Sequence, residues 1–192
     1  MSILDAFASG ELERLEWIFA GVAVVVGGLY GFVAVGRRRH WRRIARALAE
    51  LAPKVAGRVL EPTMPPRLRF CVDGFHGTLS FPWSLRPRLF FFLPGSRDRV
   101  PRTCVEIRLP RAVDFRFAEG EDVARAPRHL REPLAFARSL DRTGVARADI
   151  VVRAGSGLLL VEKLTWLERP DLLEALLGAC VRLARGLGET GL

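Results

Sequence analysis

The sequence is poor in cysteine and histidine, the residues that most often build disulfide frameworks and zinc sites. It has 3 cysteines and 3 histidines, and no two cysteines form a CxxC pair. An odd number of separated cysteines suits a reducing compartment better than a disulfide framework. The scattered histidines match no zinc module. We therefore expect no metal site and no cofactor, and we expect the soluble part of the chain to lie in the cytoplasm.

Lysine is almost missing as well, although the chain is strongly basic. Lys54 and Lys163 are the only lysines among 30 basic residues, and this arginine bias, with many Ala, Gly and Pro residues, indicates a GC-rich bacterial genome. A net charge of +9 favours an anionic partner, either phospholipid headgroups, nucleic acid or an acidic protein. The basic block RRRHWRR at residues 37–43 directly follows an apolar run, and this position points first to lipid.

Charged residues are absent from residues 17–36, which read WIFAGVAVVVGGLYGFVAVG. A helix of about 20 residues with a rise of about 1.5 Å per residue spans about 30 Å, the thickness of the hydrocarbon core of a bilayer. Trp17 and Trp41 flank the run, as aromatic residues do at membrane interfaces. A cleaved signal peptide has the opposite charge order, with basic residues before its apolar stretch. The sequence therefore predicts a single transmembrane helix at 17–36.

The charges on either side of this helix predict its orientation. Residues 1–16 hold four acidic residues and one arginine, whereas residues 37–43 are strongly basic. The positive-inside rule keeps the arginines in the cytoplasm and places the short N-terminus outside. We therefore expect a single-pass protein of the plasma (inner) membrane with a cytoplasmic C-terminal domain. The residues expected to face the membrane or its headgroups are Trp17, Arg37, Arg38, Arg39, Trp41, Arg42 and Arg43.

Three small residues, Ala23, Gly27 and Gly31, occur four positions apart within the predicted span. This spacing places them on one helix face, where a second helix could approach closely. The alternative is that Gly and Ala are simply common in membrane helices. Helix pairing or self-association through this face is therefore a hypothesis.

Residues 37–53 are predicted to form a basic amphipathic helix next to the membrane. Trp41, Ile44, Leu48 and Leu51 recur at a spacing of three to four residues, with arginines on the other faces. The arginines would bind lipid headgroups, or they would only set the topology while the apolar side packs on the domain. We favour the second interpretation, because the positive-inside rule alone explains the arginines.

Residues 54–192 are predicted to form one α+β domain, with a mainly antiparallel sheet and helices packed on one side. Short runs with strand periodicity alternate with turn signals such as the pair Asp73 and Gly74. The expected elements are strands at 67–72, 77–83, 88–93, 103–109 and 113–118, a helix at 126–140, a hairpin of 149–152 with 158–161, and a helix that begins at Pro170.

The nearest approach to a catalytic group is formed by Cys71, Asp73 and His76. Strand alternation would place Cys71 and Asp73 on one face with His76 across the turn, and a thiol nucleophile needs a base and an orienting group within reach. A cysteine in a strand is more often a small buried hydrophobe, so these three residues are weak candidates. The sequence has no phosphate-binding loop, nucleophile elbow or nucleic-acid-binding motif.

The sequence therefore favours a non-enzymatic role, that of a membrane-anchored interaction or assembly module with a cytoplasmic domain. The alternatives are an enzyme that acts at the membrane surface and a regulatory domain that binds anionic lipid. The expected partners are the lipid bilayer and either another protein or a second copy of the chain, while nucleic acid is disfavoured.

Overall fold

The computed structural model describes residues 11–60, 65–82, 102–140 and 149–189 of the 192-residue chain. The chain divides into two compact units, Met1–Arg42 and Arg43–Leu192. Helix α2 (Glu11–Leu51) contributes residues to both. Among the described residues, the first unit is made of α2 alone, and the second contains the sheet and the other helices.

The apolar part of α2 presents large hydrophobic side chains around its whole circumference. Trp17, Phe19, Tyr30 and Phe32 are each at least 70% exposed, and the large aliphatic side chains between them are exposed too. Among the described residues this is the one helix long and apolar enough to cross a membrane. The predicted apolar helix near the N-terminus is confirmed to that extent.

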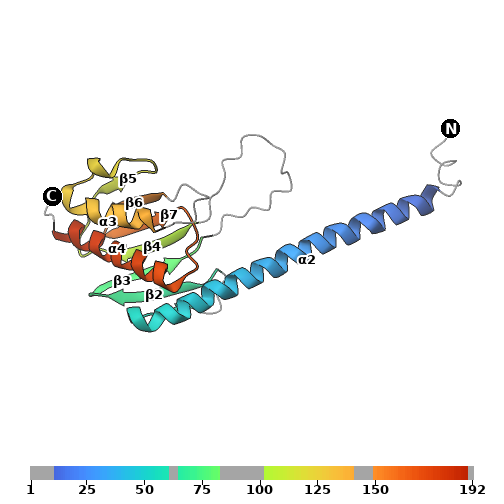
Figure 1. Cartoon of the computed structure of the whole chain (residues 1–192), viewed down its shortest axis with the longest axis horizontal. Helices are drawn as coiled ribbons and strands as arrows, with labels where there is room; N and C mark the ends of the chain where they lie inside the picture. The colour runs from blue at the N-terminus through green and yellow to red at the C-terminus, as the bar shows by residue number, and fades with distance from the viewer. Residues whose placement is uncertain (1–10, 61–64, 83–101, 141–148, 190–192) are drawn as a thin grey trace. The chain divides into compact units, whose positions relative to one another are not determined.

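The second unit is built on one seven-stranded antiparallel sheet (Figure 1). Neighbouring strands are mostly consecutive in sequence, but β7 returns to pair with β4 at the centre. In spatial order the strands are β1 (Arg58–Leu60), β2 (Arg67–Val72), β3 (Phe75–Ser80), β4 (Thr103–Arg108), β7 (Leu158–Lys163), β6 (Ile150–Gly155) and β5 (Phe115–Phe117).

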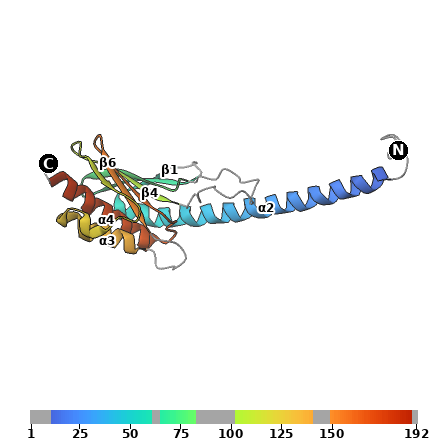
Figure 2. The ribbon, with the colours of Figure 1, turned by 90° about the horizontal axis from the view of Figure 1, so that it is seen from above.

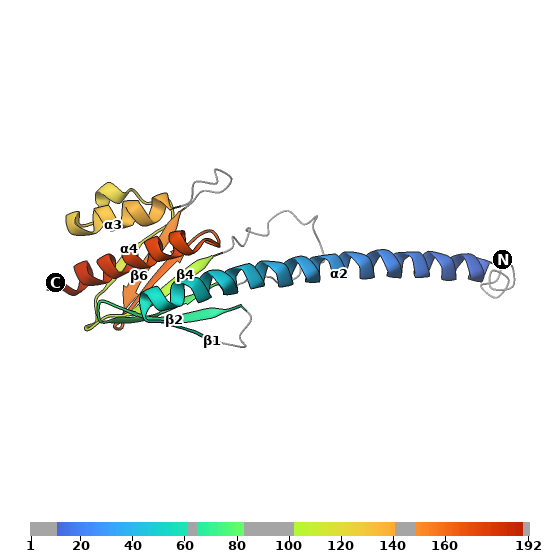
Figure 3. The same ribbon diagram turned by 60° about the horizontal axis from the view of Figure 1, so that its bottom comes forward.

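Three helical segments cover one face of this sheet. They are residues 43–51 of α2, helix α3 (Arg128–Ser139) and helix α4 (Pro170–Glu189), which lie on the same side in Figure 2 and Figure 3. Helix α3 packs against α4, and the two helices contact β6 and β4 respectively. Two short 3-10 helices, η1 (Ala52–Val55) and η2 (Val123–Arg125), precede β1 and α3. No helix among the described residues covers the other face, which we call the open face.

The core lies between the helices and the sheet, because every second residue of a strand points to the covered side. One row of directly opposed residues crosses all seven strands on this side, and every member except Val59 is at most 1% exposed. The members are Val59, Leu68, Leu79, Val105, Val161, Val152 and Phe117. The helices contribute equally buried side chains, among them Ile44, Leu48, Leu134, Leu173 and Leu177.

The predicted α+β class with a mainly antiparallel sheet is confirmed. Strands β2 and β4, the hairpin of β6 with β7, and helices α3 and α4 lie close to their predicted ranges. The sequence does not predict β1, because three prolines make residues 54–66 resemble a connecting segment. Strand β3 begins at Phe75, two residues before the predicted start. The predicted strand at 88–93 lies outside the described residues.

Gly77 of β3 lets its neighbours in β2 and β4 approach closely. It lies on the covered face, and a Cβ atom there would overlap the ring of Phe70 and the carbonyl oxygen of Glu106. We expect Gly77→Ala to lower the free energy of unfolding by about 1–3 kcal/mol, the usual cost of overpacking. Chemical denaturation of the detergent-solubilised protein measures this change.

Gly155→Ala is the matched control for this prediction. Gly155 ends β6, and a Cβ atom there would meet no atom within 4 Å. We expect its free energy of unfolding to change by less than about 0.5 kcal/mol. Equal losses in the two variants would show that the Phe70 contact is not the reason for glycine at position 77.

Candidate functional site

The open face presents the strand residues that alternate with the buried row. One set of directly opposed residues crosses all seven strands on this face, and we call it the cross-sheet row. In spatial order its members are Arg58, Arg69, Thr78, Glu106, Leu160, Arg153 and Arg116. The four arginines and the glutamate are exposed, whereas the threonine and the leucine are half-buried.

Arginine directly opposes arginine at both ends of the cross-sheet row. Arg58 faces Arg69 between β1 and β2, and Arg116 faces Arg153 between β5 and β6. Directly opposed like charges destabilise a sheet. An opposite-charge pair stabilises it by about 0.2–1 kcal/mol, and we take the cost of a like-charge pair to be of the same size. None of the four arginines has a hydrogen bond or ion pair with a residue that the structure describes. Within the part of the chain that the structure describes, the row therefore ends in two arginines without an ion-pair partner on each side.

Several arginines elsewhere in the domain do have partners. Arg102 donates to Glu162 and Arg185 donates to Asp73, each at 2.8 Å. Some arginines of the domain are therefore paired with carboxylates. Those of the cross-sheet row have no carboxylate partner among the described residues. An incoming carboxylate would find their guanidinium groups available, in the fork geometry that binds it in two places.

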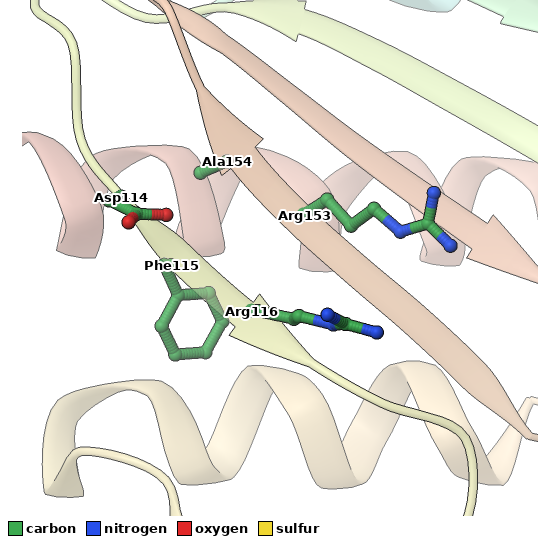
Figure 4. Close-up of a pocket in the computed structure, with 5 residues that line it drawn as sticks. All are labelled: Asp114, Phe115, Arg116, Arg153 and Ala154. Carbon is green, nitrogen blue, oxygen red and sulfur yellow. The ribbon is translucent and has the colours of Figure 1, made fainter.

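A shallow hollow of about 390 Å³ lies at the β5 end of the row (Figure 4). Asp114, Phe115, Arg116, Arg153 and Ala154 line it. The guanidinium groups of the two arginines extend in the same direction, away from the Asp114 carboxylate and the Phe115 ring. The hollow therefore presents two cationic side chains that extend in the same direction, with the Asp114 carboxylate just before the start of β5.

A buried polar network holds this end of the sheet in place. The Asp149 carboxylate, just before β6, accepts hydrogen bonds from Arg138 Nε at 2.9 Å and Nη2 at 2.8 Å, and from the Ile150 N–H at 2.8 Å. The Gly120 N–H, from the turn after β5, donates to the other carboxylate oxygen. The fully buried Lys163 donates from Nζ to the Arg138 carbonyl at 2.7 Å. The network ties α3 to β7 and to the segments that flank β5 and β6.

The same contacts set the charge state of Asp149. Burial alone would raise its pKa, but the Arg138 guanidinium and the N–H groups of Ile150 and Gly120 outweigh burial and hold the pKa below the ordinary value of 3.8. A carboxyl group with a depressed pKa in the folded state stabilises the fold above its unfolded-state pKa. That contribution is lost as the pH falls through the folded-state value.

We expect Asp149→Asn to lower the free energy of unfolding by about 2–4 kcal/mol at pH 7, because Arg138 loses its charged partner in a largely buried site. The difference from the parent protein should begin to shrink as the pH falls below the unfolded-state pKa of about 3.9, and it should vanish only below the lower folded-state pKa, where the parent carboxyl is itself protonated. Denaturation at several pH values measures both effects. Asp114→Asn, at an exposed carboxylate, is the control and should leave stability unchanged. A difference that does not vary with pH would contradict the assignment.

Two of the three free cysteines are buried. Burial raises the pKa of the Cys104 thiol to about 12, and the Glu162 carboxylate, 3.9 Å from its sulfur, adds to the rise. Burial also raises the pKa of Cys180. Because only the thiolate is a good nucleophile, neither residue is suited to covalent catalysis at neutral pH.

The structure brings together two of the three weak catalytic candidates. Cys71 and His76 directly oppose each other on the open face of β2 and β3, half-buried and exposed respectively. Asp73 occupies the turn between the strands with φ of 50°, and its carboxylate accepts from Arg185 of α4. Among the described residues, no hydrogen bond joins Asp73 to His76.

The residues predicted to face lipid headgroups differ in exposure. Arg38, Arg39 and Arg42 are exposed, and Trp41 is 2% exposed. Arg43 is also exposed and lies 3.7 Å from the Glu168 carboxylate. The Arg37 side chain lies outside the described residues.

The predicted helix-pairing face is open in the structure. Ala23, Gly27 and Gly31 are exposed, and Cβ atoms added at the two glycines would meet no atom within 4 Å. No residue that the structure describes fills the space beside these glycines, and pairing through this face stays a prediction.

The sequence offered one signal for the cross-sheet row that is visible only in retrospect. Arginines alternate with buried apolar residues in RLRF at 67–70 and in FRF at 115–117. Alternation shows that these arginines share a face within each strand. The register between strands decides whether they meet, and it cannot be read from one strand alone.

No protein-family model, curated protein or solved structure matches this chain. Among the described residues, no three His, Cys, Asp or Glu side chains come close enough to hold a metal ion. The fold and the candidate site therefore define the class of protein by themselves. It is an α+β domain with one covered and one arginine-bearing sheet face, and its helix α2 has an N-terminal part that is apolar on all sides.

Proposed function

We propose that this protein is a membrane-anchored interaction module, in which α2 holds the chain in a bilayer and the α+β domain docks a partner. The observation that carries the proposal is the exposure of the described apolar side chains on all sides of the helix at residues 17–32, 34 and 35. Removing one large apolar side chain from water is favourable by about 1.5–3 kcal/mol. A helix that is apolar on all sides is stable where its surroundings are apolar, and a bilayer provides them.

The proposed topology follows from the charges that flank the apolar helix. The basic block at 37–43 would stay in the cytoplasm, and the acidic residues before position 17 would be translocated. The domain would then lie at the cytoplasmic face of the plasma (inner) membrane. Its three free cysteines suit that reducing compartment.

Two observations favour docking over catalysis. The arginines of the cross-sheet row are spread along a row across the sheet, whereas catalytic groups usually converge in a concave pocket. The Asp73 carboxylate is bound by Arg185, so it does not orient His76. An enzyme at the membrane surface would have to use the Cys71 and His76 pair without that orienting group.

The anchor is tested by placing charge in the middle of the apolar helix. Val25→Arg with Leu29→Arg should disfavour membrane insertion by about 2.5–3.5 kcal/mol for each arginine. Alkaline carbonate extraction of membranes should leave the parent protein in the membrane pellet. The double variant should appear in the soluble fraction. Val25→Leu with Leu29→Ile is the control and should behave as the parent does. Extraction of the parent protein itself would contradict the anchor.

The orientation is tested separately with a fluorescent protein that matures only in the cytoplasm, fused after Leu192. We expect the parent fusion to fluoresce. Replacing the five arginines of the basic block with glutamate should reduce the fluorescence, because the positive charge that keeps the C-terminal side of the helix in the cytoplasm is removed. Arg125→Glu with Arg128→Glu, within the domain, should leave the signal unchanged. A dark parent fusion with normal expression would reverse the proposed topology.

A further inference from the structure

We propose that the open face binds an acidic protein surface, whose carboxylates meet the two arginine pairs of the cross-sheet row and whose centre is not acidic. This inference rests on the proposed docking function and names the chemistry of the partner. Lipid headgroups and nucleic acid, which are also anionic, are the competing occupants.

The spacing of the arginine pairs defines the size of the partner surface. The row crosses seven strands, and at roughly 4.8 Å for each step its ends lie about 29 Å apart. Both pairs consist of directly opposed arginines that have no described partner. A carboxylate placed between two guanidinium groups removes their repulsion and accepts hydrogen bonds from both. The midpoints of the two pairs are five strand steps apart, about 24 Å, and a partner with two acidic clusters at that separation would engage both pairs at once.

The centre of the row distinguishes a protein from a uniformly anionic surface. Between the arginine pairs lie Thr78, Glu106 and Leu160, so the centre carries a negative charge and an apolar side chain. Leu158 lies on the same face and is 41% exposed. A leaflet of anionic lipid or a nucleic-acid backbone would bring phosphates against Glu106. A protein interface instead has a less charged core surrounded by a polar rim, and arginine is enriched there.

A second copy of the chain does not satisfy this face. Read from either end, the row begins with two arginines, passes a centre that holds Glu106, and finishes with two arginines. Two such rows placed face to face therefore set arginine against arginine in either relative direction. A symmetric dimer with the two rows opposed is therefore disfavoured, and we infer that the carboxylates come from a different protein.

Photo-crosslinking of the full-length protein in the membranes of the cell that makes it tests the proposal. The crosslinking residue p-benzoyl-phenylalanine replaces Thr78 at the centre of the row, or Ala135, which is exposed on α3, as the control position. Illumination should join the Thr78 position, and not the Ala135 position, to a protein. Mass spectrometry of the joined peptide should place carboxylate side chains on both sides of the attachment point.

Glutamine variants connect that product to the arginines. Arg58→Gln with Arg69→Gln, or Arg116→Gln with Arg153→Gln, should each lower the yield at least about tenfold. Arg125→Gln with Arg128→Gln removes the same charge from exposed positions on the helices and should leave the yield unchanged. Lysine at the four arginine positions of the row keeps the positive charge but removes the planar guanidinium group that binds a carboxylate in two places. The yield of crosslinked product should therefore fall with lysine as well.

Several results would overturn the proposal. They are the absence of a product, a product with lipid or nucleic acid only, a product peptide without flanking carboxylates, and a yield that the glutamine pairs do not change. The thermal unfolding midpoint of each glutamine variant should equal or exceed that of the parent, because a like-charge pair is removed. A lower midpoint would assign the arginines to folding and would also overturn it. Recovery of every variant in the membrane pellet checks the anchor independently, so failure of the anchor is distinguished from failure of the acidic partner.

Discussion

The pairing of β4 with β7 is the interaction on which the rest of the domain depends. Strands β1 to β3 reach the remainder of the sheet through β4, and β6 and β5 reach it through β7. Six directly opposed residue pairs fix this central register. A slip of one residue would turn every side chain of one half of the sheet to the other face relative to its neighbours. The buried row and the cross-sheet row would then both be broken in the middle.

Two buried polar residues at one end of this strand pair specify its register. Thr103 directly opposes Lys163, and both are fully buried. The Thr103 hydroxyl donates to the Thr165 carbonyl at 2.8 Å and accepts from the Leu167 N–H at 3.0 Å, while the lysine donates to a carbonyl of α3. Displaced by one residue, these groups would lose their hydrogen-bond partners in the core, which is costly. The hydrogen bonds of these two buried residues therefore favour one register between β4 and β7 more strongly than apolar packing would do alone.

Structural features that depend on neighbouring residues could be predicted from the sequence, whereas features that depend on distant residues could not. Helix α4 and strand β4 follow from periodicity within a few residues, and the α+β class follows from such elements together. Strand β1 has only three residues and a proline-rich neighbourhood, so its local signal is weak. The arginine pairs and the Asp149 network depend on contacts between distant segments, which no local pattern contains. Cys71 stands out in the sequence because a nucleophile is recognised by its residue type. The cross-sheet row does not, because its distinguishing property is the placement of ordinary charges.

The two arginine pairs also make the domain respond to ionic strength in an unusual way. Salt at physiological concentration screens exposed charges beyond about 8 Å, and it weakens the repulsion within each pair of the unoccupied sheet. The same ions compete with any carboxylate that approaches the guanidinium groups. Added salt would therefore stabilise the empty face and weaken the proposed complex with an acidic surface, so that complex would be strongest when the surrounding solution is dilute.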